Sequence, residues 1–447
     1  MKQYEEYKTT NIPWLDKIPK HWELLHNTII FKEKKDIVGS NYKNYTLLSL
    51  TTNGIVKRDI ESGKGKFPAS FNTYKKVEAN NIIFCLFDID ETPRTVGLSK
   101  YNGMITGAYN IFDIKQNNIY YIYYYYLSLD YFKQLKPLYS GLRKTIKLNK
   151  FFSMETPIPP KHEQDKIVAY LDYQTSNINK LILSKRKQIE LLEEYKKTKI
   201  SEAVTKGLNP NAEMKESGID WIGQIPKHWE IKKLKEILKQ NSDKNNTNLP
   251  LLSVVREKGI IVRDINNKKE NHNFIPNDLS NYRVVNNGNF VINKMKAWQG
   301  SYGISFHKGI VSPAYFVYTV RKTELLFFNY AIRSYNYIPF FRIYSDGVRV
   351  DQWDLSAIKI KNINFITPPL DEQKEIAAYL DNLTFKLDNL ISKHKLYIEK
   401  LEEYKKILIS DVVTGKIDVR DIDIPEYEKI EINEDTEEKS DDEVKME

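Results

Sequence analysis

The side chains that could carry catalysis do not fall into the spacings that catalysis requires. The seven histidines include no HExxH pair, and Cys85 is the only cysteine. One thiol cannot build an internal disulfide or a cysteine-based zinc site. Because Cys85 lies within the apolar run NIIFCLF, we predict a buried structural thiol. His21 and His228 each precede a tryptophan in the motif IPKHWE, and we interpret them as packing residues.

Motifs for nucleotide chemistry are also missing from the sequence. No segment matches the phosphate-binding pattern that ends in GK[ST], and no GxGxxG follows a predicted strand. Amino-methyltransferases hold a flipped base with a polar residue before Pro-Pro and an aromatic ring after it. Here the contexts are Ile-Pro-Pro-Lys at 158–161 and Thr-Pro-Pro-Leu at 367–370, which we interpret as helix starts. Converging carboxylates with a metal can escape this search, so a self-sufficient nuclease or methyltransferase is the alternative function.

The chain contains two copies of one long unit. WLDKIPKHWEL from Trp14 returns as WIGQIPKHWEI from Trp221, an offset of 207 residues. PPKHEQDKIVAYLD from Pro159 returns as PPLDEQKEIAAYLD from Pro368, and LEEYKK also occurs twice. Solenoid repeats span only about 20–50 residues, so we interpret the chain as a tandem duplication of a whole domain.

Each copy changes character at its Pro-Pro pair. Before it lie short runs rich in Ile, Val, Tyr and Phe, broken by Gly, Asn and Asp, which indicate a β-rich domain. After it lie 161–206 and 371–414, rich in Leu, Lys, Glu and Gln without internal Pro, which indicate long helices. The predicted divisions are a β-rich domain at 1–157, a helix at 158–208, a second β-rich domain at 209–366, a second helix at 367–415 and an acidic, disordered tail at 416–447.

Apolar residues recur along both helices at spacings that alternate between four and three. The second helix carries Ile376, Leu380, Leu383, Leu387, Leu390, Tyr397, Leu401, Tyr404 and Leu408, and the first carries Ile167, Leu171, Ile178, Leu181, Leu192 and Tyr195. A helix of about 44 residues, roughly 66 Å long, rarely keeps such a seam unless it is paired. We therefore predict that the helices form a coiled coil with each other. Lys185 and His394 take equivalent central positions, where they could fix the register or extend to water.

The charge of the chain is distributed unevenly. The net charge is +9, but residues 416–447 hold five Lys/Arg and 14 Asp/Glu, which leaves +18 on the preceding residues. A basic body favours a polyanionic partner, and nucleic acid fits best because no apolar run could span a bilayer and no lipidation motif occurs. Excess lysine that merely solubilises the surface is the alternative. The N-terminus lacks the apolar core of a secretory signal, so we expect a cytoplasmic protein without membrane contact.

Three signatures occur at corresponding places in both copies or between them. They are IPKHWE at the start of each copy, the Pro-Pro, EQ and AYLD segment at 159–172 and 368–381, and the joining segment ISEAVTKGLNPNAEMKESGIDWIGQIP. Together they make the chain, from Trp14 to about Arg420, resemble the specificity subunit of Type I restriction–modification systems. The resemblance implies an α+β chain with two β-rich target-recognition domains in tandem, each followed by a long helix, and the two helices paired as an antiparallel coiled coil.

The resemblance also implies a function and partners. Each target-recognition domain would read one half of a bipartite, asymmetric site in double-stranded DNA, and the chain itself would be non-catalytic. Two modification (methyltransferase) subunits would dock on the helices and supply S-adenosylmethionine and adenine-N6 methylation. Restriction subunits would add ATP-driven translocation and cleavage, so S-adenosylmethionine, ATP and Mg²⁺ are expected on partner subunits and no cofactor on this chain. An RNA-binding or purely structural scaffold is a further alternative.

Comparison of the two copies separates a shared frame from candidate DNA readers. The sharpest divergence precedes VGLS and YGIS, where FDIDETPRTVG in the first copy stands against NKMKAWQGSYG in the second. Polar and aromatic side chains in these loops can donate to a base or stack on it, although sequence drift is the alternative explanation. The segments SGLRKTIK and DGVRVDQW share an arginine, which is expected at phosphate or in the frame. The candidate DNA contacts are Arg94, Thr95, Arg143, Lys144, Lys294, Lys296, Trp298, Gln299 and Arg349.

Overall fold

The computed structural model describes residues 2–59, 68, 70–140, 144–244, 246–264, 275–276, 278–347 and 353–432. The chain divides into two compact units, the first made of residues 1–186 and 395–447 and the second of residues 187–394. This division passes through both long helices. Each unit therefore contains one β-rich domain, the beginning of the helix that follows it and the final part of the other helix.

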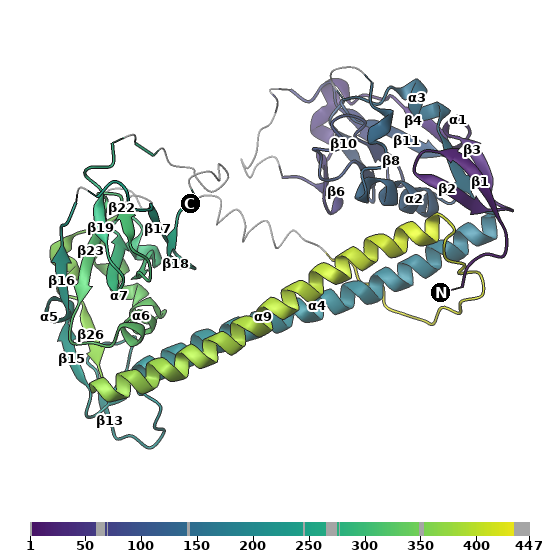
Figure 1. Cartoon of the computed structure of the whole chain (residues 1–447). Coiled ribbons are helices and arrows are strands. Elements are labelled where there is room, and N and C mark those ends of the chain that lie inside the picture. The colour runs from purple at the N-terminus through teal and green to yellow at the C-terminus, as the bar shows by residue number, and fades with distance from the viewer. Residues whose placement is uncertain are drawn as a thin grey trace. The chain divides into compact units, whose positions relative to one another are not determined.

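A four-stranded antiparallel sheet in the order β4-β11-β8-β9 forms the centre of the first domain (Figure 1). Its strands are β4 (Phe31–Lys34), β11 (Asn110–Ile114), β8 (Ile82–Phe84) and β9 (Val96–Leu98). Four antiparallel pairs join β1 (Tyr7–Ile12) to β2 (Leu15–Pro19), β3 (Glu23–His26) to β12 (Glu155–Ile158), β5 (Leu48–Thr51) to β6 (Gly54–Lys57), and β7 (Lys75–Val77) to β10 (Gly103–Ile105). The short helices are α1 (Asn27–Ile30), η1 (Gly39–Asn44), α2 (Ile119–Tyr131), η2 (Lys136–Leu138) and α3 (Leu148–Ser153).

The second domain repeats the central sheet and the four strand pairs of this plan, and its described residues add a fifth pair. Its central sheet has the order β16-β23-β20-β21, formed by β16 (Leu238–Asn241), β23 (Tyr315–Val320), β20 (Asn289–Asn293) and β21 (Tyr302–Ile304). The antiparallel pairs join β13 (Met214–Glu216) to β14 (Gln224–Pro226), β15 (Glu230–Lys233) to β26 (Asn364–Thr367), β17 (Leu252–Val255) to β18 (Gly259–Val262), β19 (Arg283–Val285) to β22 (Gly309–Val311), and β24 (Ser345–Asp346) to β25 (Asp354–Leu355). The short helices are α5 (Leu234–Ile237), η3 (Ala297–Gln299), α6 (Leu325–Arg333), α7 (Ile338–Ile343) and α8 (Ala357–Ile360). The predicted duplication and α+β class are confirmed.

The long helices are α4 (Lys161–Lys206) and α9 (Leu370–Val413). In the first unit, Lys405 Nζ donates to Asn179 Oδ1 at 2.8 Å, and Arg186 lies 3.7 Å from Glu402. In the second unit, Lys196 lies 2.6 Å from Asp388. Within the first unit, residue numbers rise along α4 as they fall along α9, so the paired segments are antiparallel as predicted (Figure 1). Among the described residues, no helix combines the length and apolar character needed to cross a membrane.

The buried seam of these helices differs by one residue from the predicted seam at several layers. The wrongly assigned residues are 44–47% exposed, namely Leu390, Tyr397, Tyr404, Leu181 and Tyr195. Their more enclosed neighbours are Ile391, Ile398, Lys405, Ile182 and Lys196. Lys405 and Lys196 reach polar partners with their amines, so their aliphatic stems can take seam positions. Apolar spacing alone could not reveal those partners.

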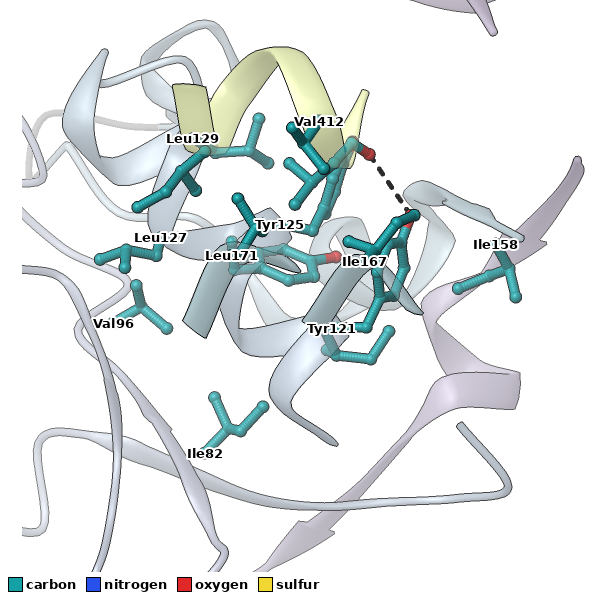
Figure 2. Packing of buried hydrophobic residues seen from close by; sticks show 14 of the residues in the cluster. Ile82, Val96, Tyr121, Tyr125, Leu127, Leu129, Ile158, Ile167, Leu171 and Val412 are labelled. Carbon is teal, nitrogen blue, oxygen red and sulfur yellow. Dashed lines mark hydrogen bonds between the residues drawn. The ribbon is translucent and has the colours of Figure 1, made fainter. Parts of the chain in front are cut away.

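The first domain and the helix pair share one hydrophobic core. Figure 2 shows Tyr121 and Tyr125 of α2 beside Ile167 and Leu171 of α4 and Val412 of α9, and all five are fully buried. The Tyr121 hydroxyl donates to a carbonyl at the end of β12 at 2.8 Å. The beginning of α4 and the end of α9 therefore belong to the core of the first domain, and buried apolar surface joins them to it.

Part of the predicted disordered tail is ordered. The segment 421–432, here called the tail strap, lies against α4 in the first unit. Ser176 Oγ donates to the Glu428 carbonyl at 2.9 Å, and Tyr427 packs on a tyrosine of α4 with 5.2 Å between ring centroids. The prediction of disorder rested on acidic composition. It did not foresee that polar side chains of α4 form hydrogen bonds with backbone groups of the tail strap. Residues 433–447 lie outside the described residues.

Candidate nucleic-acid interface

In the first unit, IPKHWE ties the domain to the first turn of α4. Trp22 is fully buried and donates its Nε1–H to Glu163 Oε1 at 2.9 Å. His21 Nε2 lies 2.8 Å from Oε2 of the same carboxylate, and the Tyr4 hydroxyl also donates to it. We call this set the first clamp, formed by Tyr4, His21, Trp22 and Glu163.

The second unit repeats the arrangement at α9. Trp229, again fully buried, lies 3.0 Å from Glu372 Oε2 through Nε1, and His228 Nε2 lies 2.8 Å from the same oxygen. We call these three residues the second clamp. The glutamate belongs to the EQ segment that follows each Pro-Pro pair, so two motifs that recur in the sequence bind each other in the fold.

A glycine at the end of the other long helix completes each clamp. Gly415 follows α9 with φ +73°, and a Cβ there would lie 2.4 Å from Pro19 and 3.3 Å from Trp22. Gly207 follows α4 with φ +74°, and a Cβ there would lie 3.1 Å from Trp229. Only glycine combines this left-handed conformation with such close approach. Each clamp therefore fastens one domain to the beginning of one helix and the end of the other.

The clamp histidines contact glutamates, and the thiol is buried. His21 and His228 each bond to a glutamate within an interface, which agrees with their interpretation as packing residues. Cys85 is 1% exposed, as predicted, and burial raises the pKa of its thiol. Among the described residues, no three His, Cys, Asp or Glu side chains gather closely enough to hold a metal ion.

In the first domain, Arg94 and Thr95 are engaged within the protein. Thr95 is 3% exposed, and its Oγ1 donates to Asp130 Oδ1 at 2.6 Å. Arg94 Nη1 lies 3.4 Å from Asp130 Oδ2, while Nη2 donates to the Thr52 carbonyl at 2.9 Å. Burial acts to lower the pKa of Arg94, but Tyr131 and its neighbours outweigh that effect and raise it. This geometry favours a bracing role for both residues over the base contacts predicted from sequence.

The second candidate segment of the first domain, SGLRKTIK, lies partly within the residues that the structure describes. Lys144 has φ +45° and places Nζ 2.5 Å from Glu91 Oε1 and 3.5 Å from Asp90 Oδ2. The bond to Glu91 raises the pKa of Lys144. Its side chain is 44% exposed, so the ammonium can still reach a phosphate. Arg143 lies outside the described residues.

In the second domain, the predicted loop residues gather around η3. Lys294 Nζ lies 3.1 Å from Asp354 Oδ2, and the ring centroids of Trp298 and Trp353 are 5.5 Å apart. Trp298 Nε1 and Gln299 Oε1 are buried without a hydrogen-bond partner in the structure.

Two remaining candidates in this domain are placed differently. Lys296 stands at the N-terminal cap of η3 and is partly exposed. Arg349 lies outside the described residues. The structure therefore brings Lys294, Lys296, Trp298 and Gln299 into one loop, whereas it describes neither of the two arginines shared between the copies.

Sequence reasoning missed the partners of these residues. Trp353 lies in the segment DGVRVDQW, but its packing on Trp298 joins positions 55 residues apart and had no local signal. Arg333, at the end of α6, donates to the carbonyls of Arg256 and Glu257 at 3.1 and 3.0 Å. No motif marks Arg333, because its role depends entirely on a turn distant in sequence.

Both copies of the repeated unit match one known family. Residues 23–191 and 226–400 match the family described as Type I restriction modification DNA specificity domain. The Type I restriction enzyme MjaVIII specificity subunit of Methanocaldococcus jannaschii is 29% identical over 291 residues, which cover 61% of this chain and 64% of that protein, just under two thirds of its length. The putative type I restriction enzyme MjaX specificity subunit of the same organism is 25% identical over 459 residues, covering 93% and 97%.

A solved structure supports the fold. A chain from work described as the structural basis of complex assembly and conformational transition of the type I R-M system superposes with a TM-score of 0.62 at 14% identity, covering 90% of this chain and 99% of that one. At this identity the likeness concerns architecture alone. Since the family match covers both copies and well over half of the residues, the chain belongs to the Type I restriction modification DNA specificity family.

Proposed function

We propose that this chain is the non-catalytic DNA-recognition subunit of a Type I restriction–modification complex, in which each domain reads one half of a bipartite, asymmetric DNA site. One observation carries the proposal: two domains whose central sheets have the same strand order are each clamped to helix ends through a Trp, a His and a Glu, yet they differ in the loop before β9 and β21. A common frame with different loops supplies two different readers.

Base recognition in the second half-site is assigned to the loop around η3. Lys294 and Lys296 are partly exposed and supply donors, and Trp298 and Gln299 belong to the same loop. Lysine amines match the acceptors of the guanine edge in the major groove. Arg143, Lys144 and Arg349 are assigned to phosphate, and Arg94 and Thr95 support the first loop from inside.

The long helices are assigned to two modification subunits. Large apolar side chains are exposed along both, namely Leu181, Leu183, Leu191, Tyr195, Phe385, Leu390, Leu396, Tyr397, Tyr404 and Ile407. Exposed apolar surface of this extent is typical of protein interfaces. In this proposal S-adenosylmethionine, ATP and Mg²⁺ bind to modification and restriction subunits, and this chain contributes sequence recognition and spacing.

The proposal is tested with the purified full chain, alone and with the modification subunit. The chain alone should bind DNA weakly and leave it unmodified in the presence of S-adenosylmethionine, ATP and Mg²⁺. Addition of the modification subunit should give tight binding to one bipartite sequence, identified by mapping methylated adenines. Methylation or cleavage by the chain alone would contradict the proposal, as would equal site-specific affinity with and without the partner.

A further inference from the structure

Both domains brace the same hairpin turn with an arginine, but the arginine comes from different elements. The first tip, residues 52–54, joins β5 to β6, and the second tip, residues 256–259, joins β17 to β18. Arg94, from the loop between β8 and β9, donates to the first tip through Nη2 and Nε at 2.9 and 3.3 Å. Arg333, from the end of α6, donates to two carbonyls of the second tip at 3.1 and 3.0 Å.

The local packing explains why the two domains use different arginines. A Cβ on Gly259 would lie 2.1 Å from Arg333 Nη1, and one on Gly303 of β21 would lie 3.0 Å from the same atom. Arg333 therefore passes between two glycines to reach the second tip. In the first domain the equivalent Gly97 faces the side chains of Leu50 and Ile55 instead. Those apolar groups fill the route, and Arg94 reaches the tip from the other loop.

Each brace places a guanidinium where burial is unfavourable. The Arg94 side chain is 14% exposed, and burial lowers the pKa of Arg333. Moving a cation away from water costs free energy, which the Asp130 carboxylate offsets for Arg94, whereas the neutral carbonyls that accept from Arg333 offset it only in part. Two unrelated arginines that reach the same turn indicate that the position of the tip itself is under constraint.

The exposed side chains of the two tips differ in chemical type, as expected if each tip reads a different base. Thr52 and Asn53 are exposed on the first tip, and Arg256 and Lys258 are exposed on the second. Asparagine pairs with the adenine edge in the major groove, whereas arginine and lysine pair with the guanine edge. The backbone of both tips is held, while their outward side chains are free to vary.

We propose that the two hairpin tips are base-reading elements, and that Arg94 and Arg333 are the positioning residues that aim them. Asn53 reads in one half-site, and Arg256 with Lys258 reads in the other. This inference rests on the proposed function, because it assigns surfaces within domains that read DNA.

The first experiment compares tip variants in the complex of the full chain with its modification subunit. The readout is discrimination between matched and single-base-substituted DNA, together with the mapped methylation sequence. Arg256→Ala with Lys258→Ala should reduce discrimination at one or more positions of one half-site by about tenfold or more and leave the other half-site unchanged. Asn53→Ala should relax only the other half-site. Lys308→Ala, at an exposed lysine between β21 and β22, is the matched control and should change neither.

The second experiment tests the positioning residue. Arg333→Lys keeps the charge but loses the planar guanidinium that passes between Gly259 and Gly303 and donates to both carbonyls through Nη2, so it should relax the same half-site positions as the tip variant. Variants that weaken binding uniformly without changing base preference, or that relax both half-sites together, would overturn the inference. A wild-type complex without any sequence preference would instead contradict the proposed function.

Discussion

Removal of the clamp glutamate should lower the free energy of unfolding more at the first clamp, in Glu163→Ala, than at the second clamp, in Glu372→Ala. Glu163 is 1% exposed and accepts from Trp22, His21 and the Tyr4 hydroxyl. Glu163→Ala leaves the donors of Trp22 and Tyr4 buried without a partner. At about 1–3 kcal/mol for each unsatisfied buried donor, the free energy of unfolding should fall by about 2–6 kcal/mol.

The second clamp offers the matched comparison within the same chain. The Glu372 side chain is 23% exposed and His228 is 52% exposed, so water can replace part of what the carboxylate supplies. Only Trp229 Nε1 is left as a buried donor in Glu372→Ala. The expected loss is about 1–3 kcal/mol, roughly half of that at the first clamp.

Urea unfolding of the full chain, followed by far-ultraviolet circular dichroism, measures both losses. Glu163→Gln keeps an acceptor of the same size and should lie between wild type and Glu163→Ala. Glu190→Gln changes an exposed glutamate of the same helix and should behave as wild type. If Glu163→Ala were no more destabilising than Glu190→Gln, the clamp would not hold the domain, and the reasoning from buried donors would be refuted.

Four further predictions concern the tail and the helices. Arg420 holds the pKa of Asp418 below its ordinary value of 3.8, so the pair stabilises the fold at neutral pH; this contribution declines as the pH falls below 3.8 and is lost once the pH passes the lowered pKa. Asp418→Asn should therefore lower stability to urea more at pH 7 than at pH 3. Deletion of 433–447, eight acidic and two basic residues, should raise affinity for nonspecific DNA at low salt, an effect that added salt removes; unchanged affinity in a binding titration would argue against charge competition. Insertion of one heptad after Gln188 and another after His394 should preserve the seam and lengthen the gap between half-sites by about three base pairs, since seven residues add roughly 10 Å. A four-residue insertion near Thr205 should instead destabilise the second unit, because Ala203 and Val204 belong to its core; methylation mapping and urea unfolding distinguish these outcomes.

Local patterns in the sequence determined the duplication and the long helices. The predicted helical runs 161–206 and 371–414 correspond to Lys161–Lys206 and Leu370–Val413 in the structure. These features follow from Pro-Pro starts and from composition over tens of residues, which act on the chain locally. The repeat also separated shared frame from divergent loops, since copies of one fold need the same backbone support.

Only the tertiary structure decided which side chains face inward and what they bind. Arg94 is a cationic residue in a divergent loop and was predicted to contact DNA, yet its guanidinium donates to a carbonyl 42 residues away. Lys405 takes a seam position because Asn179 on the other helix accepts from its amine. The tail strap is ordered because side chains of α4 form hydrogen bonds with its backbone. The acidic composition of the tail does not predict those bonds. In each case the outcome depends on a partner distant in sequence, and the free energy of a polar group is set by that partner and by its burial.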